Sequence, residues 1–519
     1  MITNMTEILK APLSSRQTRN PLHESVQELL KQIGPGKMPA VAYDTAWVAR
    51  LGEINWELSS RALNWLNEHQ LPDGSWGAER PFYYHDRVIS TLAAMIALTH
   101  RGRRAQDHAQ IERGLLALEA ITDSATQRLH SDSNGATVGF EMIVPTLVAE
   151  AERLGIIKRQ GERILGRLGR LRKAKMEKLS GQRISKFITV AHSLEMAGTD
   201  KLDLLDVDNL QEENGSVANS PAATVYFALK VKPGDPKAID YLQNIIGSDG
   251  GVPSFAPFDI FERVWILWNL LLTEEYHNSE LESLYQPHLD YLQQNWKPGH
   301  GLGFSASYTL TDGDNTMVGY EVLSKFGRNV DIETVFNYEE ENWFRCYHLE
   351  TNPSIDVNIH ALGALRQAGI ESNHLSVRKA LSFIKKSRSP KNYWFDKWNV
   401  SPYYTTAHAI ILCRGYDDEL CADSVNWILK TQKADGSWGF YDFSTAEETA
   451  YCLQALLIWK RQGGKVPKKS VEQGSYWLAK NSLSPRPPFW IDKSLYYPQL
   501  LVESSILSAL ILAEEEEIL

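Results

Sequence analysis

Two carboxylates separated by one glycine, Asp312 and Asp314, stand in the string LTDGDNTM at residues 310–317. Carboxyl groups this close can move each other's pKa apart, so that one keeps its proton near neutral pH. Such an acid in a dry, aromatic cavity has the chemistry needed to protonate a carbon–carbon double bond. The same string is also good turn or cation-loop chemistry, so the pair alone leaves both interpretations open.

Helical periodicity dominates the chain that must position this pair. Apolar residues recur at three- and four-residue spacings, while strand-like alternation is scarce. The sequence therefore predicts an all-α protein built from helix pairs joined by short turns. The expected helices cover residues 55–70, 86–100, 110–122, 140–155, 221–231, 258–273, 374–387, 402–414, 420–432, 446–461 and 499–514.

A repeated turn favours the same architecture. The string QLPDGSWG at 70–77 recurs as QKADGSWG at 432–439, with weaker relatives at 211–216 and 249–253. Repetition of this kind predicts a stacked or closed helical array instead of a single bundle. Asp-Gly turns the chain, the Trp covers the gap between helices, and the Gln amide can bond backbone groups freed at a helix end. We interpret the element as scaffold.

Composition and charge narrow the class of protein. The 519 residues are enough for two or three domains, and 43% of them are hydrophobic and 23% charged. The net charge of −10, without a basic stripe, argues against a nucleic-acid partner. The chain has no signal-peptide pattern and no run near the roughly 18 apolar residues of a membrane span. A cytoplasmic protein with at most peripheral membrane contact is expected.

The turn repeats and the Asp-x-Asp string together resemble a class II terpene cyclase. The likeness covers nearly the whole chain and is closest to bacterial diterpene cyclases that form halimadienyl and kolavenyl diphosphates, relatives of the copalyl diphosphate synthases. Further strings that carry it are AYDTAW at 42–47, DRVISTL at 86–92, VGFE at 138–141, AHSLE at 191–195, NSPAAT at 219–224 and DIFERVW at 259–265.

This resemblance implies two α/α-barrel domains, called β and γ, with the active site between them. Residues 1–35 would form an N-terminal helical segment of the β domain. Residues 36–275 would form the γ-like barrel, and residues 276–519 the β-like barrel that carries the general acid.

The resemblance also implies a substrate and a reaction. Geranylgeranyl diphosphate would fold between the domains, Asp314 would protonate its terminal alkene, and the remaining double bonds would capture the cation to give a decalin. Aromatic faces from 15 Trp, 21 Tyr and 16 Phe would stabilise the cation, by about 0.5–2 kcal/mol each when desolvated. The diphosphate would be retained and passed to a class I diterpene synthase or a phosphatase. Mg²⁺ is the expected cofactor, and the oligomeric state is left open.

Roles around the acid follow from the family motif Asp-x-Asp-Asp, in which the middle Asp is the general acid. Asp314 takes that role and Asp312 the first acidic position. Asn315 replaces the last Asp, which leaves the acid in place but alters its tuning. Asn358 and His360 are candidates for holding the second oxygen of the acid, with ordinary helix packing as the alternative.

The stopping point of the reaction depends on the base. Copalyl-forming relatives use a His and an Asn through a water; His192 matches the first position, but Ser254 stands at the second. The half-kept pair predicts weak early deprotonation and a rearranged product of the halimane or clerodane type. Alternatively, Ser254 orders the same water and the product is copalyl diphosphate, or His192 is a structural histidine.

Substrate contacts are the least specific part of the pattern. Trp398 and Tyr404 are predicted to line the cavity, with plain core as the alternative, and Glu141 is the Mg²⁺ candidate. A solvated surface role is the alternative for each predicted diphosphate-binding cation. Those cations are Lys178, Arg183, Lys186, Arg263 and Lys493.

Three other classes of protein fit parts of the pattern. A protein prenyltransferase β-subunit would need an Asp/Cys/His zinc site, which nothing near the four cysteines supplies, and these read as reduced, mostly buried thiols. A squalene-type triterpene cyclase is usually longer and carries an apolar membrane patch. A non-catalytic α/α-toroid binding module would leave the pair of Asp312 and Asp314 unexplained.

Overall fold

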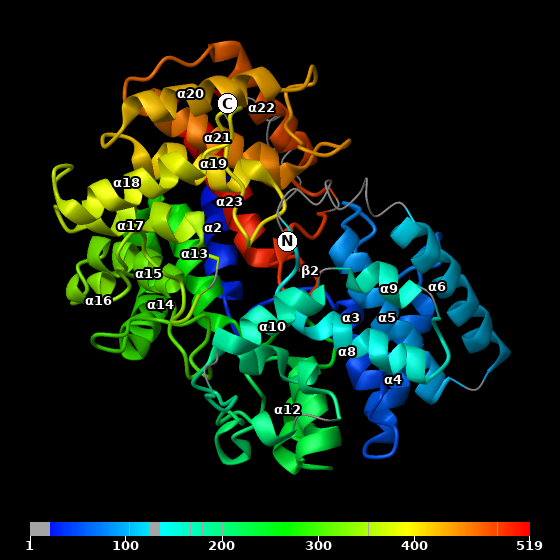
Figure 1. The fold of residues 1–519 in the computed structure, drawn as a ribbon. Helices are drawn as coiled ribbons and strands as arrows, with labels where there is room; N and C mark the ends of the chain where they lie inside the picture. Colours follow the sequence, from blue (N-terminus) through cyan, green and yellow to red (C-terminus); the bar gives the residue numbers. More distant parts are fainter. Residues whose placement is uncertain are drawn as a thin grey trace.

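The computed structural model describes residues 21–102, 104–123, 135–158, 160–166, 168–178, 181–199, 202–350, 352–484 and 486–519. Helices dominate these residues and gather in two units, each with its own hydrophobic core (Figure 1). The predicted all-α fold is confirmed. The first 20 residues of the predicted segment 1–35 lie outside the described chain.

One unit is a closed ring of helices wrapped by a second layer. Each inner helix contacts the next one, and the last returns to the first. The inner helices are α13 (Asp259–Leu271), α15 (Gly313–Lys325), α17 (Ile355–Gln367), α19 (Pro402–Cys413), α21 (Ala446–Arg461) and α23 (Gln499–Glu515). The outer layer comprises α2 (Pro21–Gln32), α14 (Glu282–Asn295), α16 (Glu333–Phe336), α18 (Leu375–Ser387), α20 (Asp418–Thr431) and α22 (Lys468–Asn481). Because α19 is buried at every residue, its apolar side chains need not lie on one face.

The other unit is a smaller ring of the same kind, in which the helices again contact one another in turn. Its inner helices are α3 (Ala42–Ala49), α5 (Tyr84–Arg101), α8 (Phe140–Arg153), the 3₁₀ helix η2 (Thr189–Ala197) and α11 (Pro221–Tyr226). Around them lie α4 (Trp56–Glu68), α6 (Ala105–Asp123), α9 (Gln160–Leu165), α10 (Leu168–Lys178) and α12 (Pro236–Ile245). Short segments complete the chain: η3 (Leu202–Leu204), η4 (Val207–Asn209), the π-helical η5 (Phe227–Val231), η6 (Glu274–His277) and η7 (Ser279–Leu281).

The border between the two units differs from the expected one near residue 275. Val252 belongs to the core of the smaller unit, whereas Phe255 already belongs to the larger core. Helix α13 packs against α15 and α23 and so closes the larger ring. It therefore belongs to the larger unit. The polar stretch at 273–280 is instead the connection from α13 to α14. Helix α2 packs against α14 and α23, so the described chain begins in the larger unit.

The two strong turn repeats have the same geometry. Trp76 and Trp438 are fully buried, and each indole N–H donates at 2.8 Å to a backbone carbonyl of the helix before the turn. The side-chain amides of Gln70 and Gln432 each bond a carbonyl of their own turn and one of the next outer helix, α6 or α22, at 2.8–2.9 Å. The repeat therefore ties successive helix pairs together.

A small hairpin brings chemistry from the larger unit to the smaller one. Strand β1 (Trp490–Ile491) pairs antiparallel with β2 (Leu495–Tyr496). In the turn between them, the Asp492 carbonyl accepts a backbone N–H of the smaller unit at 2.9 Å, and the Lys493 ammonium pairs with Glu195 at 2.8 Å. The hairpin is thus fixed to both units.

The four cysteines are buried and free of disulfides, as predicted: Cys346, Cys413, Cys421 and Cys452.

Within the described ranges, no helix has the length and apolar character that crossing a membrane requires.

Candidate active site

A cavity of about 970 Å³ lies between the two units. Parts of residues 135–142 and 187–193 of the smaller unit, and of 297–315, 337–356 and 490–496 of the larger unit, form its wall. Aromatic rings cover much of that wall: Phe255, Phe261, Trp265, Phe304, Tyr308, Trp398, Tyr404, Trp490 and Tyr496. A concave, mostly apolar space with a few polar groups is typical of a small-molecule site.

Asp312 caps the N-terminus of α15. Its carboxylate accepts the Asn315 backbone N–H at 2.7 Å, and the Asn315 side-chain amide donates to both carboxylate oxygens at 2.9 and 3.1 Å. Gly313 donates its N–H to the Cys346 carbonyl at 2.8 Å, and a Cβ there would collide with a carbonyl of the same loop. The string is therefore a helix start that places Asp314 in the first turn of α15, facing the cavity.

The pKa of Asp312 is raised to about 7. Burial is the main cause; the neighbouring charge of Asp314 adds to it, while the hydrogen bonds from Asn315 oppose it. Asp312 therefore keeps a proton through the acidic range.

Asp314 begins a chain of buried side chains that crosses three neighbouring inner helices. Its Oδ1 lies 2.6 Å from Nδ1 of His360 on α17, and Nε2 of His360 lies 2.8 Å from Nδ1 of His408 on α19. Burial, followed by repulsion from His360, holds the pKa of His408 well below its usual range. A neutral His408 can orient His360 without adding a positive charge near the acid.

Of the two candidates for holding the acid, His360 contacts Asp314 and Asn358 bonds other groups. The Asn358 side-chain oxygen accepts the Phe344 N–H at 2.8 Å, and its amide donates to the carbonyls of Phe344 and Ser354 at 3.1 and 2.8 Å. These bonds occupy the amide and tie a loop to α17. The expectation that Asn358 holds the second oxygen of the acid is therefore wrong.

Aromatic rings surround the chain of Asp314 and its partners. Trp398 and Tyr404 line the cavity, as the sequence predicts. The Tyr404 hydroxyl accepts the Trp265 indole N–H at 3.0 Å, and the Trp265 ring meets the ring of His360 edge-on, with centroids 5.7 Å apart. A cation formed next to Asp314 would therefore face aromatic surface.

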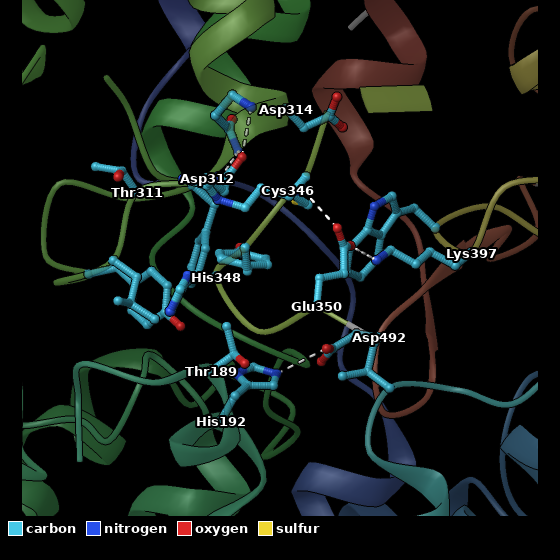
Figure 2. Close-up of a pocket in the computed structure, with 18 of the residues that line it drawn as sticks. Thr189, His192, Thr311, Asp312, Asp314, Cys346, His348, Glu350, Lys397 and Asp492 are labelled. Carbon is cyan, nitrogen blue, oxygen red and sulfur yellow. Dashed lines mark hydrogen bonds and ion pairs between the residues drawn. The ribbon is translucent and has the colours of Figure 1, made fainter. Parts of the chain in front are cut away.

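A second polar group lies on the opposite side of the cavity (Figure 2). Nε2 of His192 lies 2.9 Å from Oδ1 of Asp492, and Nδ1 of His192 lies 3.2 Å from the Ala218 carbonyl. The Ser254 hydroxyl donates to Oδ2 of Asp492 at 2.6 Å. The two residues at the predicted base positions, His192 and Ser254, thus meet through a carboxylate that sequence reasoning missed.

Four of the five predicted diphosphate-binding cations are not among the residues that line the cavity. Arg263 donates at 2.7 Å to two backbone carbonyls, and Lys493 forms its buried ion pair with the smaller unit. The expectation is wrong for these two, because protein groups already occupy their side chains. Arg183 is exposed and Lys186 partly exposed, both outside the cavity wall. The Lys178 side chain lies outside the described residues.

Other cations line the cavity instead: Lys175, Lys297, Arg345 and Lys397. Three of them have carboxylate partners, whereas the contact of Lys297 Nζ is a 3.3 Å bond to the Thr309 carbonyl. Figure 2 shows Lys397 with its partner Glu350 at one side of the pocket. No short motif marks these residues; the sequence signal is that Lys297 and Arg345 lie in the connections before and after the helix that carries the acid.

Glu141 faces the cavity, but its carboxylate is paired with Lys175. In the part of the chain that the structure describes, no group of three or more His, Cys, Asp or Glu side chains could hold a metal ion. A Mg²⁺ site usually combines one or two carboxylates with waters and substrate phosphates. Glu141, already neutralised, does not fit a resident Mg²⁺ site by itself.

Two helical rings that enclose an acid in an aromatic cavity define a terpene cyclase of the kind that begins by protonating an alkene. The family model described as the squalene-hopene cyclase C-terminal domain matches residues 346–494. A relative, the type B diterpene cyclase of Mycobacterium tuberculosis, is 51% identical over 497 residues, which cover 95% of this chain and 99% of the relative. The chain therefore belongs to the class II diterpene cyclases, and it is an enzyme of the isomerase type.

Solved structures agree with this family. The ent-copalyl diphosphate synthase from Streptomyces platensis has a TM-score of 0.76 and 25% identity, with 95% of this chain and 100% of the other covered. That of Arabidopsis thaliana shares the fold with a TM-score of 0.64 and 21% identity, over 94% of this chain and 62% of the other. A chloroplastic ent-copalyl diphosphate synthase of Zea mays is 28% identical over a match that covers 79% of this chain and 51% of the relative. This chain thus spans about half the length of that relative.

Proposed function

We propose that the protein cyclises geranylgeranyl diphosphate to a bicyclic diterpenyl diphosphate. The observation that carries the proposal is the contact between Asp314 and His360 in a cavity walled by aromatic rings. Two relatives support the substrate class. The Mycobacterium protein is named a diterpene cyclase, and the Arabidopsis synthase was crystallised with an aza-dihydrogeranylgeranyl thiolodiphosphate.

The first step is proton transfer from Asp314 to the terminal double bond. Because Oδ1 of Asp314 faces His360, Oδ2 is the oxygen left to carry the proton toward the cavity. The O–H bond breaks, and the π electrons of the alkene form the new C–H bond, which leaves a tertiary cation on the neighbouring carbon. Two further double bonds attack in turn and close the decalin.

The cavity wall protects the cation while the rings form. Trp265 and Tyr404 stand next to the acid, and their faces stabilise a desolvated cation by about 0.5–2 kcal/mol each. Asp314 is only 9% exposed, so little water reaches the first cation. Exclusion of water prevents capture as an alcohol.

The diphosphate keeps its bond to carbon, because none of these steps ionises it. Lys297, whose ammonium has three donors and one long hydrogen bond, is the cation best placed to bind it. Arg345 and Lys397 also line the cavity, but each is paired with a carboxylate. The diphosphate product then suits a class I diterpene synthase or a phosphatase.

For the product we favour a rearranged skeleton of the kolavenyl or halimadienyl type over copalyl diphosphate. Both ring nitrogens of His192 are engaged by protein atoms, one 2.9 Å from Asp492 and the other 3.2 Å from the Ala218 carbonyl, so the ring is poorly placed for an early deprotonation. The cation then persists long enough for hydride and methyl shifts. Copalyl diphosphate without rearrangement remains the alternative product.

Product identification tests the proposal. Purified protein is incubated with geranylgeranyl diphosphate and Mg²⁺, the products are dephosphorylated, and the alcohol is identified by mass spectrometry and NMR. We expect a bicyclic diterpene alcohol, whose skeleton decides between rearranged and copalyl products. Unchanged geranylgeraniol would contradict the substrate, and parallel incubation with farnesyl diphosphate controls for chain length.

A further inference from the structure

Both ring nitrogens of His192 have protein partners. The Ala218 carbonyl can only accept, so Nδ1 of His192 donates to it at 3.2 Å. Nε2 faces Oδ1 of Asp492 at 2.9 Å. The ring is therefore held by the protein at both nitrogens, and it positions the carboxyl group of Asp492.

The ionisation of Asp492 follows from its surroundings. Burial alone would raise its pKa, but the charge and hydrogen bond of His192, followed by Lys493 and Ser254, hold the pKa of Asp492 below its ordinary value. Other carboxyls on the cavity wall behave in the opposite way. Burial is the main cause that raises the pKa of Asp312, Glu350 and Asp356.

Asp492 has acceptor capacity to spare. A carboxylate offers about four lone-pair positions, of which His192 and Ser254 occupy one on each oxygen. The side chain lines the cavity. Its backbone is fixed by two hydrogen bonds: the Asp492 carbonyl accepts the Val138 N–H at 2.9 Å, and the Asp492 N–H donates to the Ser494 carbonyl at 3.0 Å. It is therefore a rigid acceptor with lone pairs left for the substrate.

Position adds a constraint on timing. Figure 2 shows Asp492 and His192 across the pocket from Asp312 and Asp314. The positive charge begins beside Asp314, and ring closure carries it to the end of the new decalin that is farther from this acid. A base on the far wall therefore faces the bicyclic cation and not the cation that forms first.

We propose that Asp492 accepts the terminal proton of the reaction and that His192 is its positioning residue; this inference rests on the proposed function. A C–H bond next to the final cationic carbon breaks, its electron pair forms the product double bond, and the proton goes to a free lone pair of Asp492. Asp314 has given one proton and Asp492 has received one, so the substrate and product are isomers. Both carboxyls then exchange protons with solvent.

Two conservative variants separate the carboxylate from the imidazole. Asp492→Asn keeps the shape and can still accept from Ser254, but its oxygen is a far weaker base. His192→Gln removes the imidazole, while its amide can still donate to Asp492. Each is incubated with geranylgeranyl diphosphate, and substrate consumption and the product distribution are measured separately. Asp240→Asn, the same change at an exposed position of α12, is the control.

We expect Asp492→Asn still to consume substrate. The share of the wild-type alkene among its products should fall about tenfold or more, because a positioned base contributes about 10²–10⁴-fold. Alcohols from water capture or isomeric alkenes should take its place. His192→Gln keeps the wild-type alkene as the main product at reduced turnover. The wild-type product in unchanged proportion from Asp492→Asn would overturn the inference, as would loss of that product in His192→Gln alone.

The unmodified enzyme and Asp314→Asn complete the design. Unchanged substrate with the unmodified enzyme overturns the proposed function, and the base assignment with it. Normal consumption with an altered product in Asp492→Asn, beside no consumption in Asp314→Asn, supports the assignment. If Asp492→Asn does not fold by circular dichroism, Ser254→Ala is the second variant. It keeps the carboxylate, and a shift of its main product away from the wild-type alkene would overturn the inference.

Discussion

Oδ1 of Asp314 and Nδ1 of His360 lie 2.6 Å apart across the neighbouring inner helices α15 and α17. The bond fixes which oxygen of the acid faces the protein and which is left for the substrate. It depends on the ring closing correctly, because the two residues are 46 positions apart in the chain.

Replacement of His360 by Phe should slow the reaction without changing its product. A hydrogen bond to a charged group contributes about 1.5–3 kcal/mol, so turnover of geranylgeranyl diphosphate should fall about 10- to 100-fold. His277→Phe, the same change at an exposed site, is the control. Wild-type turnover by His360→Phe would show that the contact does not assist the acid.

Lys297→Met should weaken substrate binding. The ammonium lines the cavity and has one long hydrogen bond to the protein, so its donors are available to the diphosphate. We expect KM to rise about tenfold or more with little change in kcat, as for an interaction made equally in ground and transition states. Lys186→Met, outside the cavity wall, should leave both constants unchanged. A fall in kcat alone would contradict the binding role.

Asp312 should make the stability of the fold depend on pH. Its folded-state pKa is raised from 3.8 to about 7, so its stabilising contribution is complete below pH 4 and is lost as the pH rises through 7. Asp312→Asn keeps the helix cap but cannot ionise. The melting temperature of the variant relative to wild type should therefore rise between pH 4 and pH 7 and then level off. A constant difference across that range would contradict the shifted pKa.

Lys493 should act on stability and not on substrate binding. Its ammonium and the Glu195 carboxylate are both fully buried and 2.8 Å apart. Loss of one partner leaves an uncompensated buried charge, which costs about 3–5 kcal/mol. Lys493→Met should lower the melting temperature, and the double variant Lys493→Met/Glu195→Gln should recover part of the loss. An unchanged melting temperature with a raised KM would restore Lys493 to the substrate site.

Local patterns predicted the elements that short stretches of chain determine. The repeated Gln and Trp turns and the expected helices depend on neighbours within a few residues. The helices that carry Asp314 and His360, α15 and α17, were not among those expected, and the string that starts α15 was interpreted as a turn. Trp398 and Tyr404, both predicted at the cavity, lie just before α19 and in its first turn.

Contacts between distant segments could not be predicted in this way. His192 and Asp492 are 300 positions apart, and only the hairpin at the border of the two units brings them together. Lys493, the neighbour of Asp492, points the other way into a buried ion pair. Which of two adjacent charged residues faces a cavity depends on backbone direction, and a single sequence does not give that direction in a loop.

The most direct test of the central claim compares wild type and Asp314→Asn on geranylgeranyl diphosphate in D₂O. If Asp314 delivers the proton that starts cyclisation, the wild-type product carries one deuterium, and the variant loses turnover by at least about 10²–10⁴-fold. A variant that forms the same bicyclic product at a similar rate would contradict the account, and so would a wild-type product without deuterium whose new double bond does not include the protonated carbon.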